Sequence, residues 1–429
     1  MRRILSSICF TVALLCPWMA YAQGPTSCTT TSQNLWVRDA LTEVYYWYQF
    51  MPPGVNPASF NSPEAYLEAV RYRPIDNTFS FITLAASNDA FYSDSQFIGY
   101  GFGNQTTTTG IRVLQVYGDS PASEAGLSRG DRITSVNGRT VPAMIADGTI
   151  GSAFGAAEIG VATTIDWETQ AGERRNARMV KRLVTIPTVS LTSVVDIDGR
   201  KVGYLFFRNF VEPSKAALTE AFAALKTAGA TELVLDLRYN GGGQVDVAVQ
   251  LASLIGGTRT NGQVMLNYVH NDKIGPTLDK ATRFNNPEQA LNLQRLVVIT
   301  TRGSASASEL VINSLRPYIP VTIIGDTTYG KPVGQYGLRF CDKVLYPVAF
   351  SIKNANLEGD FFDGLAVDCE AGDDYTHQLG DSAEASFAEA LTFIRTGACS
   401  PKATTEARAL RVPQFIFRLT GWASILNAQ

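Results

Sequence analysis

The chain has 429 residues, of which 45% are hydrophobic and 17% are charged. This length and composition predict a globular protein of two or three domains and exclude a mainly disordered chain. The 36 Lys and Arg residues against 39 Asp and Glu residues give a formal net charge of −3, and no block of basic residues stands out. We therefore expect no nucleic-acid partner.

The first 22 residues have the layout of a secretory signal peptide. Two arginines precede an apolar run over residues 8–15, and Ala20-Tyr21-Ala22 matches an A-x-A cleavage site. The run is shorter than the roughly 20 residues that span a bilayer and is followed by Pro17. We expect an exported protein, periplasmic or secreted, with no stable membrane span after cleavage; a membrane anchor and a lipid-modified Cys16 are the alternatives.

Four cysteines remain after this cleavage: Cys28, Cys341, Cys369 and Cys399. An even number in an oxidising compartment predicts two disulfides, with buried free thiols as the alternative. Of the three possible connectivities we favour Cys341–Cys369, which leaves Cys28–Cys399 to join the two ends of the mature chain. No C-x-x-C spacing is present and the only histidines are His270 and His377, so we expect no metal site.

Residues 23–96 are predicted to form a helical N-terminal region. Apolar residues recur at helical spacing between residues 34 and 50, and Ser62-Pro63 begins a second helix that runs to Tyr72. We interpret the aromatic residues of the first helix as core rather than as a ligand site.

Residues 97–185 are predicted to form a compact β-rich module. Ser120-Pro121 begins a short helix that Gly126 ends, and Asn137-Gly138 is a strong hairpin turn. Short strands are expected at residues 111–116, 132–136 and 163–169.

Residues 186–400 alternate strands and helices, which predicts an α/β domain with mostly parallel strands. Strands are expected at residues 202–207, 232–237, 296–300 and 321–325, and helices at residues 214–227, 245–255 and 306–315. Residues 401–429 form a C-terminal tail of unknown role. Its mixed apolar and basic stretch, residues 411–426, is as compatible with a partner-binding helix as with a poorly packed tail.

Three serines lie between an apolar strand and a predicted helix: Ser304, Ser306 and Ser308. A serine at a helix N-terminus has free backbone N–H groups and the positive end of the helix dipole beside it, which stabilise an oxyanion. The pattern predicts a nucleophile, with helix caps as the alternative. Neither histidine lies in a triad signature, so a lysine whose pKa is lowered by burial is the candidate base. Lys331 follows an apolar strand in a turn, although an exposed turn lysine is the alternative.

Two short motifs resemble the signature pair of the C-terminal processing peptidases, also called tail-specific proteases. Ser306 precedes Ala-Ser-Glu, and Lys331 follows 25 residues later in the sequence Gly-Lys-Pro-Val-Gly-Gln. The resemblance implies that Ser306 is the nucleophile, that Lys331 is the general base and that Gln335 orients the lysine.

A glycine-rich stretch, residues 236–243, is similar to the Asp-Leu-Arg-x-Asn-x-Gly-Gly motif of the same family. The resemblance implies an oxyanion hole formed by the backbone N–H of Ala307 and that of Gly242 or Gly243. Asp236 is expected to be structural. A strained turn or a phosphate loop is the alternative for the glycines, but the Gly-Lys-Ser/Thr of a Walker motif is absent.

The β-rich module resembles the PDZ domain of this family, on the motifs Ser-Pro-Ala-Ser-Glu-Ala-Gly-Leu at residues 120–127 and Gly-Asp-Arg-Ile at residues 130–133. The preceding residues Gly99, Tyr100, Gly101 and Phe102 are similar to its carboxylate-binding loop. Such a loop can present N–H groups to a peptide carboxylate while a sheet edge pairs with the peptide backbone. A PDZ fold kept only for packing or inhibition is the alternative.

The resemblance covers residues 97–364 and implies an α/β fold with a ClpP/crotonase-like protease core, a β-rich PDZ domain and a helical N-terminal region. It implies an exported serine endopeptidase that needs no metal or organic cofactor and cleaves proteins or peptides with free, apolar C-termini. The rivals are an inactive PDZ scaffold, against which the retention of all three active-site residues argues, and a histidine-dependent hydrolase. The sequence departs from many relatives at Pro332, in place of glycine, and at Pro317, in place of an acidic residue.

Overall fold

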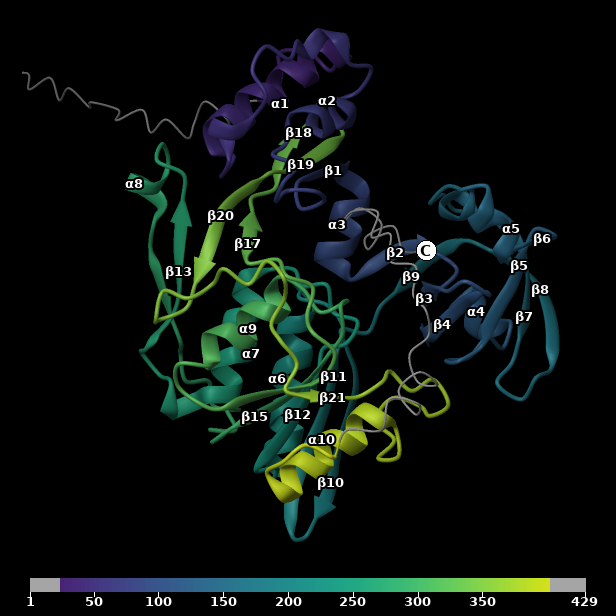
Figure 1. Ribbon diagram of the computed structural model, residues 1–429, viewed down its shortest axis with the longest axis vertical. Coiled ribbons are helices and arrows are strands. Elements are labelled where there is room, and N and C mark those ends of the chain that lie inside the picture. Colours follow the sequence, from purple (N-terminus) through teal and green to yellow (C-terminus); the bar gives the residue numbers. More distant parts are fainter. Residues whose placement is uncertain (1–23, 402–429) are drawn as a thin grey trace, which may run out of the picture.

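The computed structural model describes residues 24–401, which fold into three adjoining parts (Figure 1). The helical N-terminal region lies at one end, the α/β core at the other, and the PDZ module beside the core. The predicted signal peptide and the tail beyond residue 401 lie outside the described residues. Within residues 24–401, no helix is long and apolar enough to cross a membrane.

The N-terminal region consists of α1 (Thr30–Val44), α2 (Pro63–Val70) and α3 (Ala85–Asp94). The Ser62 hydroxyl accepts a hydrogen bond from the Ala65 N–H, so α2 begins where the sequence predicts. The buried face of α1 packs on a small antiparallel sheet of β1 (Phe81–Leu84), β19 (Lys343–Tyr346) and β18 (Leu338–Phe340). Two of these strands come from the C-terminal half of the chain, so the N-terminal region shares its hydrophobic core with the protease core.

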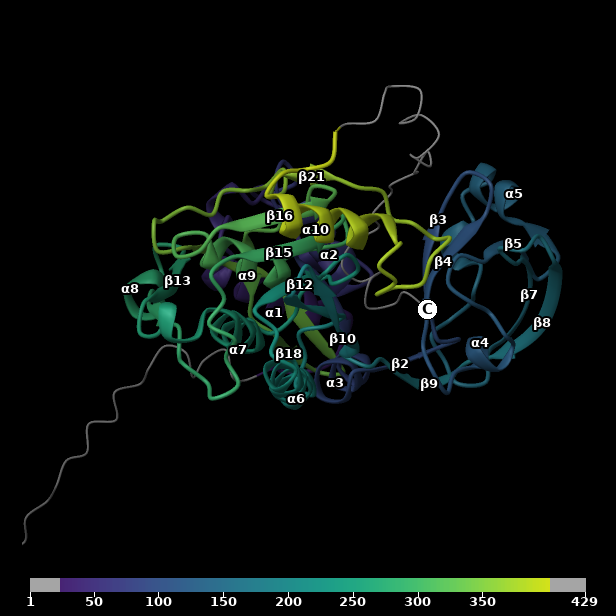
Figure 2. The ribbon, with the colours of Figure 1, turned by 90° about the horizontal axis from the view of Figure 1, so that it is seen from below.

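The PDZ module is a sheet in the order β3 (Phe102–Thr106), β4 (Ile111–Val116), β5 (Arg132–Val136), β7 (Ala162–Glu168) and β8 (Arg174–Val180). A short strand, β6 (Arg139–Thr140), forms a hairpin with β5, and α4 (Pro121–Glu124) and α5 (Val141–Ala146) complete the module. Two strands that pair with each other, β2 (Gln96–Gly99) and β9 (Arg182–Thr185), connect the module to the core (Figure 2).

The core is built on a sheet in the order β10 (Val189–Ile197), β11 (Arg200–Phe207), β12 (Glu232–Asp236), β15 (Leu296–Thr300), β16 (Val321–Gly325) and β21 (Cys369–Glu370). From β11 to β21 the strands are parallel, which confirms the predicted α/β domain. Helices α6 (Ser214–Thr227), α7 (Val245–Gly256) and α9 (Ala307–Leu315) cover one face, and α10 (Ala385–Thr396) covers the other (Figure 2). The loops that follow β12 and β15 therefore emerge at the same edge of the sheet.

A second core sheet, which the sequence did not predict, contains the strand that follows Lys331 and ends at Gln335. Its order is β14 (Ala281–Arg283), β13 (Val264–His270), β20 (Val348–Lys353) and β17 (Val333–Gln335), with α8 (Gly275–Leu278) after β13. Because β17 pairs with β20 and β1 pairs with β19, the segment after Lys331 lies between the N-terminal region and the core.

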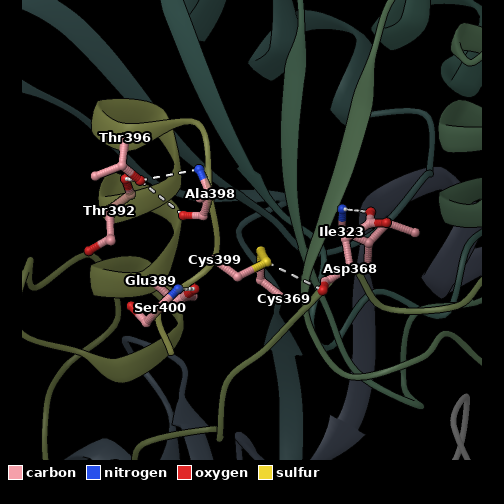
Figure 3. The surroundings of a disulfide bond; sticks show 9 residues. All are labelled: Ile323, Asp368, Cys369, Glu389, Thr392, Thr396, Ala398, Cys399 and Ser400. Carbon is pink, nitrogen blue, oxygen red and sulfur yellow. Dashed lines mark hydrogen bonds between the residues drawn. A yellow bond between two sulfur atoms is a disulfide. The ribbon is translucent and has the colours of Figure 1, made fainter. Parts of the chain in front are cut away.

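The favoured disulfide pairing is wrong. The bonds are Cys28–Cys341 and Cys369–Cys399, with Cα–Cα distances of 5.8 and 5.3 Å. Cys341 lies in the turn between β18 and β19, and this hairpin packs against α1, which begins just after Cys28. Cys399 follows α10 and bonds to Cys369 of β21 (Figure 3). The prediction assumed that the two ends of the mature chain are neighbours. The fold places α1 and α10 at opposite ends of the molecule.

Candidate active site

The structure separates the three candidate serines by their surroundings. Ser304 is buried and its hydroxyl donates to the Leu237 carbonyl at 2.7 Å, while buried Ser308 donates to the Asn240 carbonyl at 2.8 Å. Both hydroxyls therefore join the loop after β15 to the loop after β12. Ser306, at the N-terminus of α9, is the partly exposed one of the three.

The backbone of Ser306 adopts a conformation that non-glycine residues rarely occupy, with φ of 55° and ψ of −112°. Such a conformation costs on the order of 1–3 kcal/mol and persists only where surrounding contacts impose it. One of these contacts is the hydrogen bond from the Ser306 N–H to the Glu309 carboxylate, at 2.8 Å. Ser306 thus combines the N-cap position of α9 with a strained backbone.

Lys331 is 3% exposed, and its ammonium group donates to the Gln335 side-chain oxygen at 2.6 Å. Burial lowers its pKa from the ordinary value of 10.5 to about 7, although the nearby charges of Asp76 and Glu309 act in the opposite direction. The alternative of an exposed turn lysine does not hold. A lysine amine with a pKa near neutrality is suited to act as a general base.

The Gln335 amide is fixed by two backbone carbonyls. Its Nε2 donates to the Phe79 carbonyl at 2.5 Å and to the Tyr346 carbonyl at 2.9 Å. Since both N–H groups are directed at carbonyls, the amide oxygen is left to face Lys331. The orientation of Gln335 thus depends on a residue from the N-terminal region, which the sequence analysis did not connect with the site.

Glu309 is a fully buried carboxylate that joins the serine turn to the lysine loop. One of its oxygens accepts from the N–H groups of Ser306 and Lys331, at 2.8 and 2.9 Å. The other accepts from the Gly330 N–H at 2.7 Å and from the Thr328 hydroxyl at 2.6 Å. Burial raises the pKa of Glu309, while these four hydrogen bonds act to lower it. The Ser-x-x-Glu capping-box spacing was the sequence signal that could have predicted this role.

The glycine loop after β12 lies directly against the serine turn. A Cβ atom on Gly242, whose φ is +100°, would lie 2.8 Å from both the Ala305 carbonyl oxygen and the Ala307 nitrogen. The Gly242 N–H donates to the Asn240 side chain at 2.9 Å. Within residues 24–401, the N–H groups of Gly243 and Ala307 donate to no protein acceptor. Only glycine allows this close approach of the two loops.

The acidic residue of the glycine motif belongs to a buried ionic network. Asp236 accepts a hydrogen bond from the Tyr204 hydroxyl at 2.7 Å and pairs with Arg238 at 2.8 Å. Arg238 in turn forms two hydrogen bonds of 2.8 Å with Glu384, at the start of α10. These contacts assign Asp236 to the support of the loop, as the sequence analysis expected.

The histidines have partners of their own, away from the serine turn. His270 is held between the Asp279 carboxylate at 2.8 Å and the Tyr336 hydroxyl at 2.9 Å, and His377 contacts Asp374 at 2.6 Å. The side chain of Asp374 raises the pKa of His377 through this hydrogen bond. No hydrogen bond joins either histidine to Ser306 in the described part of the chain.

The predicted carboxylate-binding loop, Gly99, Tyr100, Gly101 and Phe102, lies at the start of the edge strand β3. The carbonyls of Tyr100 and Gly101 accept from the N–H groups of Ala122 and Tyr117, both at 2.8 Å. Tyr100 and Phe102 are fully buried, and the Phe154 ring lies 6.1 and 5.8 Å from their ring centroids. The loop is therefore covered by a segment of the PDZ module itself.

Three protein-family models match the chain. They describe the peptidase family S41 over residues 201–357, the peptidase S41 N-terminal domain over residues 32–81 and a PDZ domain over residues 112–148. Two of these models describe peptidase family S41, so the chain is similar to that family in its N-terminal region and in its core. The serine turn, the lysine loop and the glycine loop all lie within the S41 match.

Curated relatives match more than half of the chain. The "Probable CtpA-like serine protease" of Staphylococcus aureus is 25% identical over 246 residues, 57% of this chain and 47% of the relative. That of Staphylococcus saprophyticus is 23% identical over 272 residues, 63% of this chain and 52% of the relative. The chain thus spans about half the length of the curated relatives it matches.

Solved structures extend the comparison to the fold. A protein of Bacteroides fragilis assigned to the S41 proteases has a TM-score of 0.67 and 26% identity, covering 84% of this chain and 97% of that one. A photosystem II D1 C-terminal processing protease has a TM-score of 0.51 and 20% identity, covering 80% and 93%. The predicted resemblance and the fold class are confirmed.

Proposed function

We propose that this chain is an exported serine endopeptidase in which Ser306 and Lys331 form a catalytic dyad. The observation that carries the proposal is the state of Lys331: a fully buried amine with a pKa of about 7, whose loop is tied through Glu309 to the turn of the exposed serine. A degenerate scaffold would have no reason to bury a lysine in this way.

The reaction follows from these groups. The neutral Lys331 amine accepts the Ser306 hydroxyl proton as the oxygen attacks a peptide carbonyl carbon. Collapse of the tetrahedral intermediate breaks the C–N bond, the lysine ammonium gives its proton to the leaving amine, and an acyl-serine remains. Water then attacks the acyl carbon with Lys331 again as base, which releases the acid and restores Ser306. Gln335 keeps the lysine in place through both steps.

The oxyanion would be bound by the N–H groups of Ala307 and Gly243. The Gly242 N–H donates to Asn240, so it is engaged before substrate arrives, whereas the other two N–H groups have no protein acceptor among the described residues. Preorganised N–H donors of this kind contribute about 3–4 kcal/mol each to the transition state. This favours Gly243 over Gly242 in the choice that the sequence left open.

The PDZ module would present substrates by their free, apolar C-termini. Within residues 24–401, β3 pairs with β4 alone, so its second edge is available for a peptide strand. The loop before β3 would take the carboxylate once the segment of Phe154 moves aside. The test is binding of a fluorescent peptide with an apolar C-terminus to the Ser306→Ala protein. We expect the amidated peptide to bind at least roughly tenfold more weakly, and equal binding would contradict this part of the proposal.

Export is supported by the two disulfides, since such bonds persist in oxidising compartments. A mass that corresponds to cleavage after Ala22, measured on protein recovered from outside the cytoplasm of an expressing bacterium, would support export. Full-length protein confined to the cytoplasm would contradict it.

The activity is tested by hydrolysis of casein by the mature protein beside Ser306→Ala and Lys331→Ala. Matched controls are Ser152→Ala and Lys226→Ala, which change exposed residues of the same types. We expect both dyad variants to lose activity while the controls keep it, with folding verified by circular dichroism. Full activity in Lys331→Ala would refute the mechanism. If the wild-type protein cleaves neither casein nor peptides with apolar C-termini, the scaffold function is favoured instead.

A further inference from the structure

A short segment of the N-terminal region, residues 76–81, forms one wall of the candidate active site. The Phe79 carbonyl accepts the Gln335 amide at 2.5 Å, and the Phe79 ring centroid lies 5.9 Å from the Lys331 nitrogen. The next strand, β1, continues from this segment and pairs with β19, whose Tyr346 carbonyl accepts the second Gln335 hydrogen bond. The lysine therefore lies between the core and the N-terminal region.

Asp76 holds this segment in its conformation. Its side chain is fully buried and accepts hydrogen bonds from the Ser80 N–H at 2.9 Å, the Ser80 hydroxyl at 2.5 Å and the Tyr45 hydroxyl at 2.8 Å. The Ser80 hydroxyl also accepts from the Val348 N–H at 2.9 Å, on the strand next to β17. Asp76 thus closes a tight turn around Phe79 and anchors it to the sheet that carries Gln335.

The same carboxylate acts electrostatically on the lysine. The charges of Asp76, from the N-terminal region, and of Glu309, from α9, both raise the pKa of Lys331 against the effect of burial. Tyr329 packs against Phe81 and Ala305, and burial raises the pKa of its phenol. Around Asp76 itself the neighbouring cation is Arg71, which donates to the Ser80 carbonyl at 2.9 Å and pairs with Glu68.

We propose that Asp76 is a positioning residue of the dyad, which fixes the Phe79 carbonyl that orients Gln335 and supplies negative charge beside the lysine ammonium formed when serine is deprotonated. This inference rests on the dyad proposed above. A buried ammonium needs a nearby anion, because burial alone makes its formation unfavourable. Asp76 is one of two carboxylates whose charges favour this ammonium, the other being Glu309.

The first test compares the pH profiles of kcat/KM for Asp76→Asn and Tyr45→Phe with the wild-type protein on a fluorogenic peptide. Asp76→Asn removes the charge that raises the pKa of Lys331, so the acid limb of the profile should move to lower pH by about one unit. We expect kcat to fall at least roughly tenfold with KM within about threefold.

Tyr45→Phe removes one hydrogen bond to Asp76 but no charge, so kcat should fall less and the acid limb should stay in place. Asp39→Asn removes an exposed carboxylate of α1 and is the matched control, with an unchanged profile expected.

The second test measures the pKa of Lys331 without any substrate hydrolysis. In a Ser306→Ala background, acetylation of Lys331 by acetic anhydride is followed across pH by peptide mass spectrometry, with the exposed Lys226 as internal standard. The midpoint for Lys331 should fall when Asp76→Asn is added. If that variant does not fold, Ser80→Ala removes one of the three donors to Asp76, and the proposal then expects a lowered kcat in the active background. If Asp76→Asn changes neither the acetylation midpoint of Lys331 nor the acid limb of the kcat/KM profile, and the wild-type protein hydrolyses the peptide, the inference is wrong while the proposed function is retained. A shifted midpoint in a protein that cleaves nothing would support the effect of the Asp76 charge on Lys331 but would refute the proposed function and, with it, the positioning role.

Discussion

The carboxylate of Glu309 accepts a hydrogen bond of 2.9 Å from the backbone N–H of Lys331. The same oxygen accepts from the Ser306 N–H, so the backbones of the two proposed dyad residues are held by one atom. Their relative position is therefore set by the fold before any substrate binds. This arrangement explains why a residue with no role in the proton transfer lies fully buried at the centre of the site.

Replacement of Glu309 by glutamine should damage both stability and activity. The carboxylate accepts four hydrogen bonds, whereas an amide offers one acceptor and turns its N–H groups toward other donors. Loss of two such contacts costs about 2–4 kcal/mol of unfolding free energy. Urea unfolding and kcat measurements on Glu309→Gln check this, with exposed Glu220→Gln as the control. A variant with wild-type kcat would show that the serine turn does not depend on this carboxylate.

The buried Lys331 should make the stability of the protein depend on pH. Its pKa is lowered to about 7 in the folded chain and returns to its ordinary value near 10.5 on unfolding. Between these pH values the unfolded chain holds a proton that the folded chain lacks, so the unfolding free energy rises with pH. Lys331→Met lacks this dependence. The stability of the wild-type protein relative to Lys331→Met should therefore rise by roughly 2–3 kcal/mol between pH 6.5 and 9, measured by urea unfolding. If the difference in unfolding free energy between the two proteins does not change with pH, Lys331 is exposed to solvent and its pKa is not lowered.

The ionisation of Lys331 should also control activity, and activity, like stability, should rise with pH. Because the neutral amine is the proposed base, kcat/KM should rise with pH through about 7 and level off above pH 8. The measurement is a pH profile on a peptide whose own ionisation lies outside this range. An acid limb below pH 5 would point to a carboxylate base instead.

A buried arginine joins the PDZ module to the core. Arg129, 4% exposed, pairs with Asp373 at 2.8 Å and donates to the Tyr239 hydroxyl at 2.6 Å, one residue before Asn240 of the glycine loop. Arg129→Met should destabilise the protein by about 3 kcal/mol, since it removes these bonds and leaves Asp373 with one ion pair, to Arg238, and the hydrogen bond from the Tyr239 hydroxyl. Small-angle scattering should show a larger radius of gyration as the module separates. Arg182→Met, which removes an exposed pair within the module, should change neither quantity. An unchanged radius for Arg129→Met would mean that other contacts hold the module.

The disulfides can be tested directly by peptide mapping without reduction, which should recover Cys28–Cys341 and Cys369–Cys399. Loss of either bond should lower the unfolding free energy by about 2–5 kcal/mol, because each closes a loop in the unfolded chain. The loop of 313 residues should matter more than that of 30. A recovered Cys341–Cys369 peptide would contradict the structure.

Much of the site could be predicted from local sequence because its motifs are short and continuous. Ser306 and Lys331 each follow a strand of the core sheet, and strand order in a parallel sheet brings such loops to one edge. The core strands and helices were predicted for the same reason: apolar runs that alternate with helical patterns leave few possible arrangements. The predicted pairing of cysteines was wrong, since Cys28 and Cys341 are 313 residues apart and are brought together by packing of α1 on the β18–β19 hairpin.

The sequence by itself determined the resemblance to a peptidase family, the motifs around Ser306 and Lys331 and the residue types available for proton transfer, because these depend on neighbours along the chain. Only the tertiary structure decided which serine is partly exposed, that Lys331 is buried with its pKa lowered to about 7, and that the Gly242 N–H already donates to Asn240. It also brought the Phe79 carbonyl of the N-terminal region to the Gln335 amide and the Asp76 carboxylate to the neighbouring Ser80. Burial and hydrogen bonding depend on contacts between segments that are distant in sequence, and a local sequence pattern does not indicate which of these segments will be in contact.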